Sequence, residues 1–184
     1  MGFHTFDAAE ADRLSDPTRF RFCSREELLQ HLPTGDGTRL LDLGSGSGFY
    51  TDELAPHVGR VAALDVQRAM HGSYRDRGMP DNVDPITAEA GSLPFRDGSF
   101  DGIVSTMTFH ESTTEGSIAE AARVLAEGGR FVAVDWSAAG NGEAGPPRDE
   151  RFDAEDAGDF LADAGLSVTV AAERSETFAV VAEK

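Results

Sequence analysis

Cysteine is scarce in this sequence, and its histidines form no pattern typical of a metal site. Cys23 is the single cysteine among 184 residues, which excludes an internal disulfide and any site built from several cysteines. His4, His31, His57 and His71 show no spacing typical of a metal site, so we expect no bound metal. We interpret Cys23 as a small buried hydrophobe.

Long hydrophobic runs are also missing. No apolar stretch approaches the roughly 18 residues that a membrane span needs, and the first residues lack the apolar core of a secretory signal. The length suits one domain with a substantial core. These features predict a cytoplasmic protein that makes no contact with a membrane.

Positive charge is in short supply. Sixteen basic residues, of which Lys184 is the only lysine, face 33 acidic residues and give a net charge of −17. Such a chain repels the phosphates of nucleic acids, so we expect no nucleic-acid partner. The acidic residues are spread along the chain, which is typical of a solvated surface in a high-salt cytoplasm. This pattern favours a halophilic archaeon as the source.

The remaining sequence alternates between strand-like and helix-like segments. Such alternation predicts an α/β fold, with a doubly wound, mostly parallel seven-stranded sheet and an antiparallel C-terminal hairpin. We expect strands at 39–43, 60–66, 82–90 (weakened by Pro85), 101–106 and 130–136, with two more in 166–184, and helices at 24–32, 50–57, 67–77, 118–126 (ended by Gly128 and Gly129) and 153–164, with a flexible loop at 137–150.

The segment "LLDLGSGSGFYT", residues 40–51, leads a strand into a loop with Gly44, Gly46 and Gly48. Glycine lets a ligand approach the backbone closely, and ligands of such folds bind at the carboxyl ends of the strands. Phe49 breaks the dinucleotide spacing, whereas Asp65 ends the next strand and can accept hydrogen bonds from ribose hydroxyls. The pattern indicates an adenosine-type ligand. A tight turn without a ligand, and Asp65 as a helix cap, are the alternatives.

Several segments in order resemble class I S-adenosylmethionine-dependent methyltransferases. "LLDLGSGSGFYT" resembles their first motif, "ALDVQ" the second, "AEAGSLPFRDGSFDGIVS" the third and fourth, and "RVLAEGGRFVAVDW" the next helix and strand. The resemblance covers about residues 36–184 and is strongest for the small-molecule, ubiquinone-biosynthesis-like subgroup. It implies a Rossmann-like methyltransferase fold, with an N-terminal helical lid at 1–35 and the S-adenosylmethionine-binding domain at 36–184.

The resemblance also implies a set of residues that bind S-adenosylmethionine. By the part of the cofactor they would contact, these are Asp42 and Gly44 at the methionine moiety; Gly44, Ser45, Gly46 and Gly48 along the loop; Asp65 at the ribose; Val66, Gln67, Glu89 and Ala90 at the adenine; Ser105 and Thr106 beside the sulfonium; and Tyr50 as a cover. Glu89 as a surface carboxylate and Tyr50 as a packing residue remain alternatives.

His110 follows the fourth strand, where the resembling families often carry a histidine facing the substrate. Its pKa near neutrality suits a general base, although a loop histidine that only shapes the pocket is an alternative. Asp135 ends the fifth strand as a substrate ligand or a loop cap. The segment "STMTFHE" lacks the Asn-Pro-Pro signature of adenine and glutamine amide methyltransferases. The pattern favours a small-molecule methyl acceptor and a monomer or homodimer.

Two other functions remain open from the sequence. One is a non-catalytic S-adenosylmethionine-binding or sensor protein. The other is a nicotinamide-dependent oxidoreductase, which Phe49 and the missing catalytic Tyr-Lys pair oppose. We expect the acceptor pocket to be lined by the N-terminal segment and by residues 107–115 and 136–152.

Overall fold

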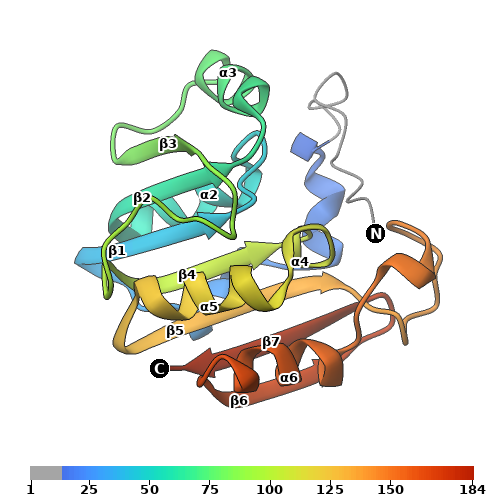
Figure 1. The fold of residues 1–184 in the computed structure, drawn as a ribbon. Helices are drawn as coiled ribbons and strands as arrows, with labels where there is room; N and C mark the ends of the chain where they lie inside the picture. Colours follow the sequence, from blue (N-terminus) through green and yellow to red (C-terminus); the bar gives the residue numbers. More distant parts are fainter. Residues whose placement is uncertain (1–13) are drawn as a thin grey trace.

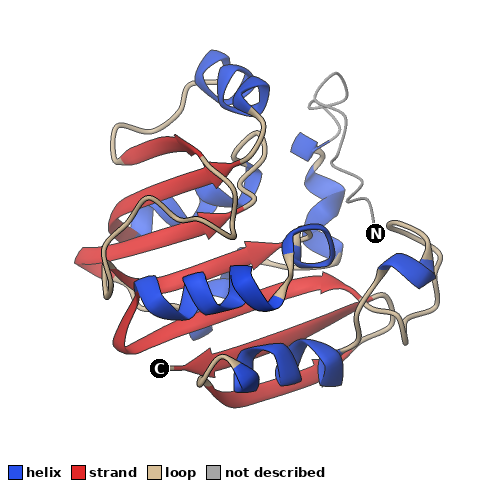
Figure 2. Ribbon diagram, viewed as in Figure 1, coloured by secondary structure: helices blue, strands red, loops and turns tan. Residues whose placement is uncertain are grey.

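The computed structural model describes residues 14–184 as a mixed sheet covered by helices on both faces (Figures 1 and 2). The strands are β1 (Gly35–Leu43), β2 (Val58–Asp65), β3 (Val83–Thr87), β4 (Phe100–Thr106), β5 (Leu125–Trp136), β6 (Ser167–Glu173) and β7 (Thr177–Glu183). The helices are η2 (Pro17–Arg21), α1 (Arg25–His31), α2 (Phe49–Leu54), η3 (Ala55–His57), α3 (Arg68–Asp76), α4 (Phe109–Ser112), α5 (Glu115–Val124), η4 (Arg148–Glu150) and α6 (Ala154–Asp163).

The seven strands lie in the order β3-β2-β1-β4-β5-β7-β6. The first five are parallel, and β7 runs antiparallel to both β5 and β6. The predicted fold class is therefore confirmed. Pro85 lies in β3 at the edge of the sheet, where its missing N–H is tolerated. The chain changes direction across the sheet between β1 and β4, and ligands of such folds bind at the carboxyl ends of the strands beside this point.

Hydrophobic side chains cover both faces of the sheet, because successive residues of a strand point to opposite sides. Leu41 of β1 packs in a cluster with Ile118 of α5 and Leu161 of α6. Its neighbour Leu40 packs in a second cluster with Leu54 of α2. Within residues 14–184, no helix is both long and apolar enough to cross a membrane.

Helix α1 is part of the second hydrophobic cluster. As predicted, it begins after Ser24, whose hydroxyl accepts a hydrogen bond from the Glu27 N–H at 3.2 Å. Cys23, Leu28 and Leu32 are buried in the cluster, which places Cys23 as the sequence predicted. The expected lid at 1–35 thus includes a helix that packs into the core. Its first 13 residues, with His4, lie outside the described part of the chain.

The predicted helix at 118–126 is displaced toward the N-terminus. Thr114 caps α5, which ends at Val124, and strand β5 begins at Leu125. Gly128 and Gly129 were expected to stop the helix but lie within β5, at an irregularity in its pairing with β4. A Cβ on Gly129 would lie 2.8 Å from the Ala126 carbonyl oxygen, so this bend needs a glycine.

The segment 137–150 is held by hydrogen bonds that its Gly- and Pro-rich sequence did not indicate. Arg151 is buried and donates to the main-chain oxygens of Ser137, Ala144 and Pro146. Glu176 accepts a hydrogen bond from the Ala144 N–H. The expectation of a flexible loop rested on composition alone. Composition does not reveal that the Arg151 side chain, just after this segment, is buried and binds its main-chain oxygens.

Candidate cofactor and acceptor site

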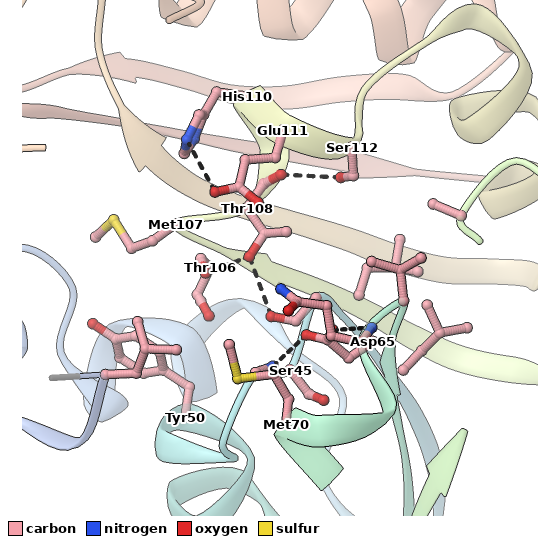
Figure 3. Close-up of a pocket in the computed structure, with 18 of the residues that line it drawn as sticks. Ser45, Tyr50, Asp65, Met70, Thr106, Met107, Thr108, His110, Glu111 and Ser112 are labelled. Atoms are coloured by element: carbon pink, nitrogen blue, oxygen red, sulfur yellow. Dashed lines mark hydrogen bonds and ion pairs between the residues drawn. The ribbon is translucent and has the colours of Figure 1, made fainter. Parts of the chain in front are cut away.

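A cleft of about 850 Å³ opens at the carboxyl ends of β1, β2 and β4 (Figure 3). Its first half is formed by the glycine loop, the end of β2 and residues 88–91. Its second half is formed by residues 106–117 together with Leu14, Arg19, Trp136, Gly145 and Pro146. The three segments expected to line the acceptor pocket therefore meet here, as far as the described residues extend.

Asp65 ends β2 and faces the cleft. Its carboxylate accepts hydrogen bonds from the Gly46 N–H at 2.9 Å and from the Gln67 N–H at 2.7 Å, one on each oxygen. Each carboxylate oxygen has a second lone pair, so both can still accept a bond from a ligand. Asp65 is not the cap of α3, because Gln67 is the N-cap and the Asp65 carboxylate accepts from the N–H of Gln67 and not from an N–H within the helix. Asp65 fixes the glycine loop and keeps acceptors for a diol.

Two glycines of the loop are required by neighbouring side chains. A Cβ on Gly44 would lie 2.1 Å from Thr108 Cγ2, and the Thr108 hydroxyl donates to the Gly44 carbonyl oxygen at 3.2 Å. A Cβ on Gly48 would lie 2.2 Å from Tyr74 Cζ, and Gly48 does not line the cleft. The expectation that all three glycines clear space for the ligand is corrected for Gly48: it clears space for an aromatic ring.

Asp42 and Ser105 were also expected at the cofactor but do not line the cleft. Both lie within strands and are buried, because their side chains point between the layers of the fold. Asp42 Oδ2 accepts a hydrogen bond from the Thr51 hydroxyl at 2.5 Å, and its Oδ1 has no partner among the described residues. Burial raises the pKa of Asp42 to about 7.

The residues predicted at the adenine line the first half of the cleft: Val66, Gln67, Glu89 and Ala90. Val66 is 50% exposed, an unusual degree for an aliphatic side chain that follows a buried strand. It offers a flat apolar surface for a planar ring. Glu89 is exposed and lines the cleft, so neither of its two interpretations is excluded.

Tyr50 and Thr106 also line the cleft. The Tyr50 hydroxyl donates to the main-chain oxygens of Arg19 and Cys23, each at 3.2 Å, while its ring borders the cleft. Tyr50 therefore packs helix α2 against the N-terminal segment, as one of its two interpretations required. Ser45, which lies in the glycine loop, also lines the cleft (Figure 3).

His110 and Asp135 form a pair in the second half of the cleft. His110 Nδ1 lies 2.9 Å from both carboxylate oxygens of Asp135, and the His110 backbone N–H donates to Asp135 Oδ2 at 2.8 Å. Asp135 is fully buried at the end of β5. A carboxylate can only accept, so Nδ1 carries a proton and Nε2 is left as the basic atom. Asp135 is thus the partner of His110.

The charged surroundings raise the pKa of His110. Burial of the ring acts against its charged form, but the hydrogen bond and charge of Asp135 outweigh it. Glu111, whose Oε1 lies 3.7 Å from His110 Nε2, contributes in the same direction (Figure 3). The imidazole of His110 is therefore a stronger base than a free histidine.

Among residues 14–184, no group of His, Cys, Asp and Glu is suited to a metal ion.

Three residues of the segments expected to line the cleft have roles there that the sequence did not indicate. Met107 has a φ of 57°, the one positive value among non-glycine residues of 14–184, and it turns the chain between β4 and α4. Such conformations cluster at functional sites. Thr108 fills the space beside Gly44, and Arg19 reaches the cleft from η2. No local pattern indicates any of them, because each depends on a contact between distant segments.

A sequence model of the methyltransferase domain matches residues 41–133, half of the chain. The chain belongs to this methyltransferase family. The bifunctional biotin biosynthesis protein BioHC of Cellvibrio japonicus is 40% identical over 106 residues, covering 56% of this chain and 21% of that protein. A ubiquinone/menaquinone biosynthesis C-methyltransferase of Ectopseudomonas mendocina is 34% identical over 113 residues, covering 57% and 44%. This methyltransferase spans less than half the length of either relative.

Solved structures agree with this family. A SAM-dependent methyltransferase from Aquifex aeolicus superposes with a TM-score of 0.87 at 30% identity, covering 97% of this chain and 98% of that one. A putative methyltransferase solved with the Haloferax volcanii Trm112 activator has a TM-score of 0.79 at 21% identity, covering 98% and 99%, and shows the shared fold. The predicted class I family is therefore confirmed, and neither the sensor nor the oxidoreductase alternative is favoured.

The cofactor of this methyltransferase is S-adenosylmethionine, as its family and structural neighbours establish. The cleft fits that molecule. It combines an inward carboxylate at Asp65, the loop at residues 44–46, and an exposed apolar surface at Val66.

Proposed function

We propose that this methyltransferase transfers a methyl group from S-adenosylmethionine to a small-molecule acceptor. The observation that carries the proposal is the Asp65 carboxylate, which faces a cleft of about 850 Å³ beside the glycine loop. When bound, S-adenosylmethionine supplies a methyl group already activated by its sulfonium. The protein's work is then to orient the reactants and exclude water.

The first half of the cleft is the proposed cofactor site. Asp65 would bind the ribose, Val66, Gln67, Glu89 and Ala90 would surround the adenine, and Ser45, Gly46 and Thr106 would border the remainder. Asp42, Gly48 and Ser105 would act by holding these residues in place, because they do not reach the cleft.

The second half of the cleft is the proposed acceptor site. His110 would remove a proton from the acceptor through Nε2, while Asp135 holds the proton on Nδ1 and stabilises the imidazolium that forms. Met107, Trp136 and Pro146 would provide apolar walls, which suits a small organic acceptor. The relatives named for ubiquinone and menaquinone biosynthesis support this class of acceptor.

The acidic composition supports further proposals about the setting of the protein. A net charge of −17 disfavours a nucleic-acid substrate and suits a cytoplasm rich in salt, as in a halophilic archaeon. We place the protein in the cytoplasm, as a monomer or homodimer. We keep the segment 1–35 as the proposed lid, whose described part borders the cleft through Leu14 and Arg19.

Two measurements test the proposed function. Isothermal titration with S-adenosylhomocysteine should show one site per chain, and an absence of binding at both low and high salt would contradict the proposal. Incubation with S-adenosylmethionine tritiated in its methyl group should then label a low-molecular-weight fraction of a cell extract. Label that appears only in protein or nucleic acid would show that the acceptor class is wrong.

A further inference from the structure

The segment at residues 88–99 borders the adenine part of the cleft but has no regular secondary structure. It connects β3 to β4, and Figure 1 shows it as a long loop where such a crossover usually carries a helix. Its residues 88–91 line the cleft. The Ser92 N–H donates to the Glu89 carbonyl oxygen at 3.0 Å and closes a turn there. The position of this turn therefore depends on contacts with other elements.

Two side chains of α5 hold the main chain that follows this turn. Glu120 Oε2 accepts a hydrogen bond from the Leu93 N–H at 2.8 Å, and Arg123 Nη2 donates to the Leu93 carbonyl oxygen at 3.2 Å. Arg123 Nη1 also donates to the Phe95 carbonyl oxygen at 2.8 Å. Both main-chain groups of Leu93 are thus bound by α5, and Leu93 itself is buried in the core.

The same two side chains are paired with each other. Arg123 Nε lies 2.6 Å from Glu120 Oε1, and Nη2 lies 2.8 Å from Oε2, a two-pronged pair between residues one helical turn apart. Hydrogen bonding to Arg123 lowers the pKa of Glu120 to about 2, so the carboxylate stays ionised at neutral pH. Arg123 Nη1 also donates to Asp97 Oδ1 at 2.8 Å. The donors of Arg123 that Glu120 does not use are therefore directed at the segment 88–99.

We propose that Glu120 and Arg123 set the preference of the cofactor site for adenine by holding the segment 88–99 in place. This inference rests on the proposed cofactor site, in which Glu89 and Ala90 surround the adenine. Adenine carries an amino group where hypoxanthine carries a carbonyl oxygen, and a site distinguishes the two only if its hydrogen-bonding groups are held in position. Glu120 and Arg123 do not line the cleft. They are positioning residues, which act through the turn at 89–92.

The test compares two ligands that differ only in the base. Isothermal titration measures the binding of S-adenosylhomocysteine and of S-inosylhomocysteine, which carries hypoxanthine, to the wild type and to Arg123→Gln. We expect the wild type to bind the adenine ligand about tenfold more tightly, the factor typical of one hydrogen bond. Arg123→Gln should lose most of this preference, because the Leu93 and Phe95 carbonyl oxygens are released, while its affinity for the hypoxanthine ligand should change less than about twofold. Arg123→Lys keeps the charge but not the planar fork, so its preference should be intermediate.

Arg60→Gln is the matched control, because it also breaks an arginine–carboxylate pair, with Asp84, and neither residue lines the cleft. This variant should keep the preference of the wild type. The proposal is overturned if the wild type does not distinguish the two ligands, or if Arg123→Gln weakens the binding of both equally, as a purely structural role would. If Arg123→Gln does not fold, Arg123→Lys decides by the same ratio. If the wild type binds neither ligand nor 5′-methylthioadenosine, the proposed cofactor site itself is wrong.

Discussion

The two halves of the cleft are built in different ways. The half proposed for adenosine comes from consecutive strand ends, and main-chain N–H groups fix its central carboxylate. The half proposed for the acceptor is assembled from side chains of η2, α4, the end of β5 and the 137–150 segment. Main-chain geometry depends on a few local residues, whereas a side-chain assembly depends on the whole fold. The first half therefore carries a sequence motif, and the second does not.

The largest effect is expected at Gly48, whose contribution to the first half is purely steric. Gly48→Ala places a methyl group inside the buried Tyr74 ring at a φ of 87°. We expect a loss of about 3 to 5 kcal/mol in the free energy of unfolding, measured by urea denaturation. The loss arises from packing, because Gly48 does not line the cleft.

Gly128→Ala separates steric overlap from backbone strain. Gly128 has a similar φ of 74°, and a methyl group added there would meet no heavy atom within 4 Å. The substitution should cost about 1 kcal/mol, the typical effect of a positive φ. Equal losses in the two variants would show that Tyr74 does not require the glycine.

Asp65→Ala should give the next largest effect. It removes the acceptor of two main-chain hydrogen bonds and the proposed ribose contact. Titration should show binding of S-adenosylhomocysteine about 100-fold weaker than in the wild type. Glu89→Ala, which removes an exposed carboxylate of the same half, should change the affinity less than about fivefold. If Glu89→Ala weakens the binding of S-adenosylhomocysteine more than Asp65→Ala does, the proposal that Asp65 binds the ribose is wrong.

The pairing of His110 with Asp135 in the acceptor half should make the free energy of unfolding depend on pH. Because the folded-state pKa of His110 is raised, its interaction with Asp135 stabilises the protein fully below the unfolded value near 6.5 and is lost as pH rises through the folded value. Asp135→Asn should therefore cost about 1 to 3 kcal/mol at acidic pH and less at alkaline pH. The histidine signal in NMR should titrate at lower pH in this variant.

His57→Gln controls for the loss of a histidine in general, since His57 is exposed and does not line the cleft. The free energy of unfolding of His57→Gln should stay within about 0.5 kcal/mol of the wild type, as is usual for an exposed side chain. If the His110 resonance titrates at the same pH in the wild type and in Asp135→Asn, then Asp135 does not raise the pKa of His110.

The smallest effect concerns the surface outside both halves. Raising the KCl concentration from about 0.1 to about 2 M screens repulsion among the acidic residues. We expect the free energy of unfolding to increase by about 1 kcal/mol, which corresponds to an increase of about 2 to 4 °C in the unfolding temperature. Binding of methylthioadenosine, which is uncharged, should change little. An unfolding temperature that falls with KCl would contradict the proposed adaptation to salt.

The sequence predicted most of the fold because its signals are local. Alternating apolar runs indicated every strand of the sheet, and Ser24 and Asp153 marked helix starts that the structure contains. The helix at 118–126 was misplaced because Gly128 and Gly129 are typical of a helix stop but serve a bend in β5. Helix α4 was missed because it is a short element of four residues.

The sequence by itself determined the layered α/β fold, the family and the place of the glycine loop and Asp65 at the ends of their strands. Apolar periodicity and glycine spacing are properties of neighbouring residues. Only the tertiary structure decided that Gly48 makes room for Tyr74, that Asp135 holds His110, and that Arg19 enters the cleft. Those contacts join residues far apart along the chain, and packing of the complete sheet and helices brings them together.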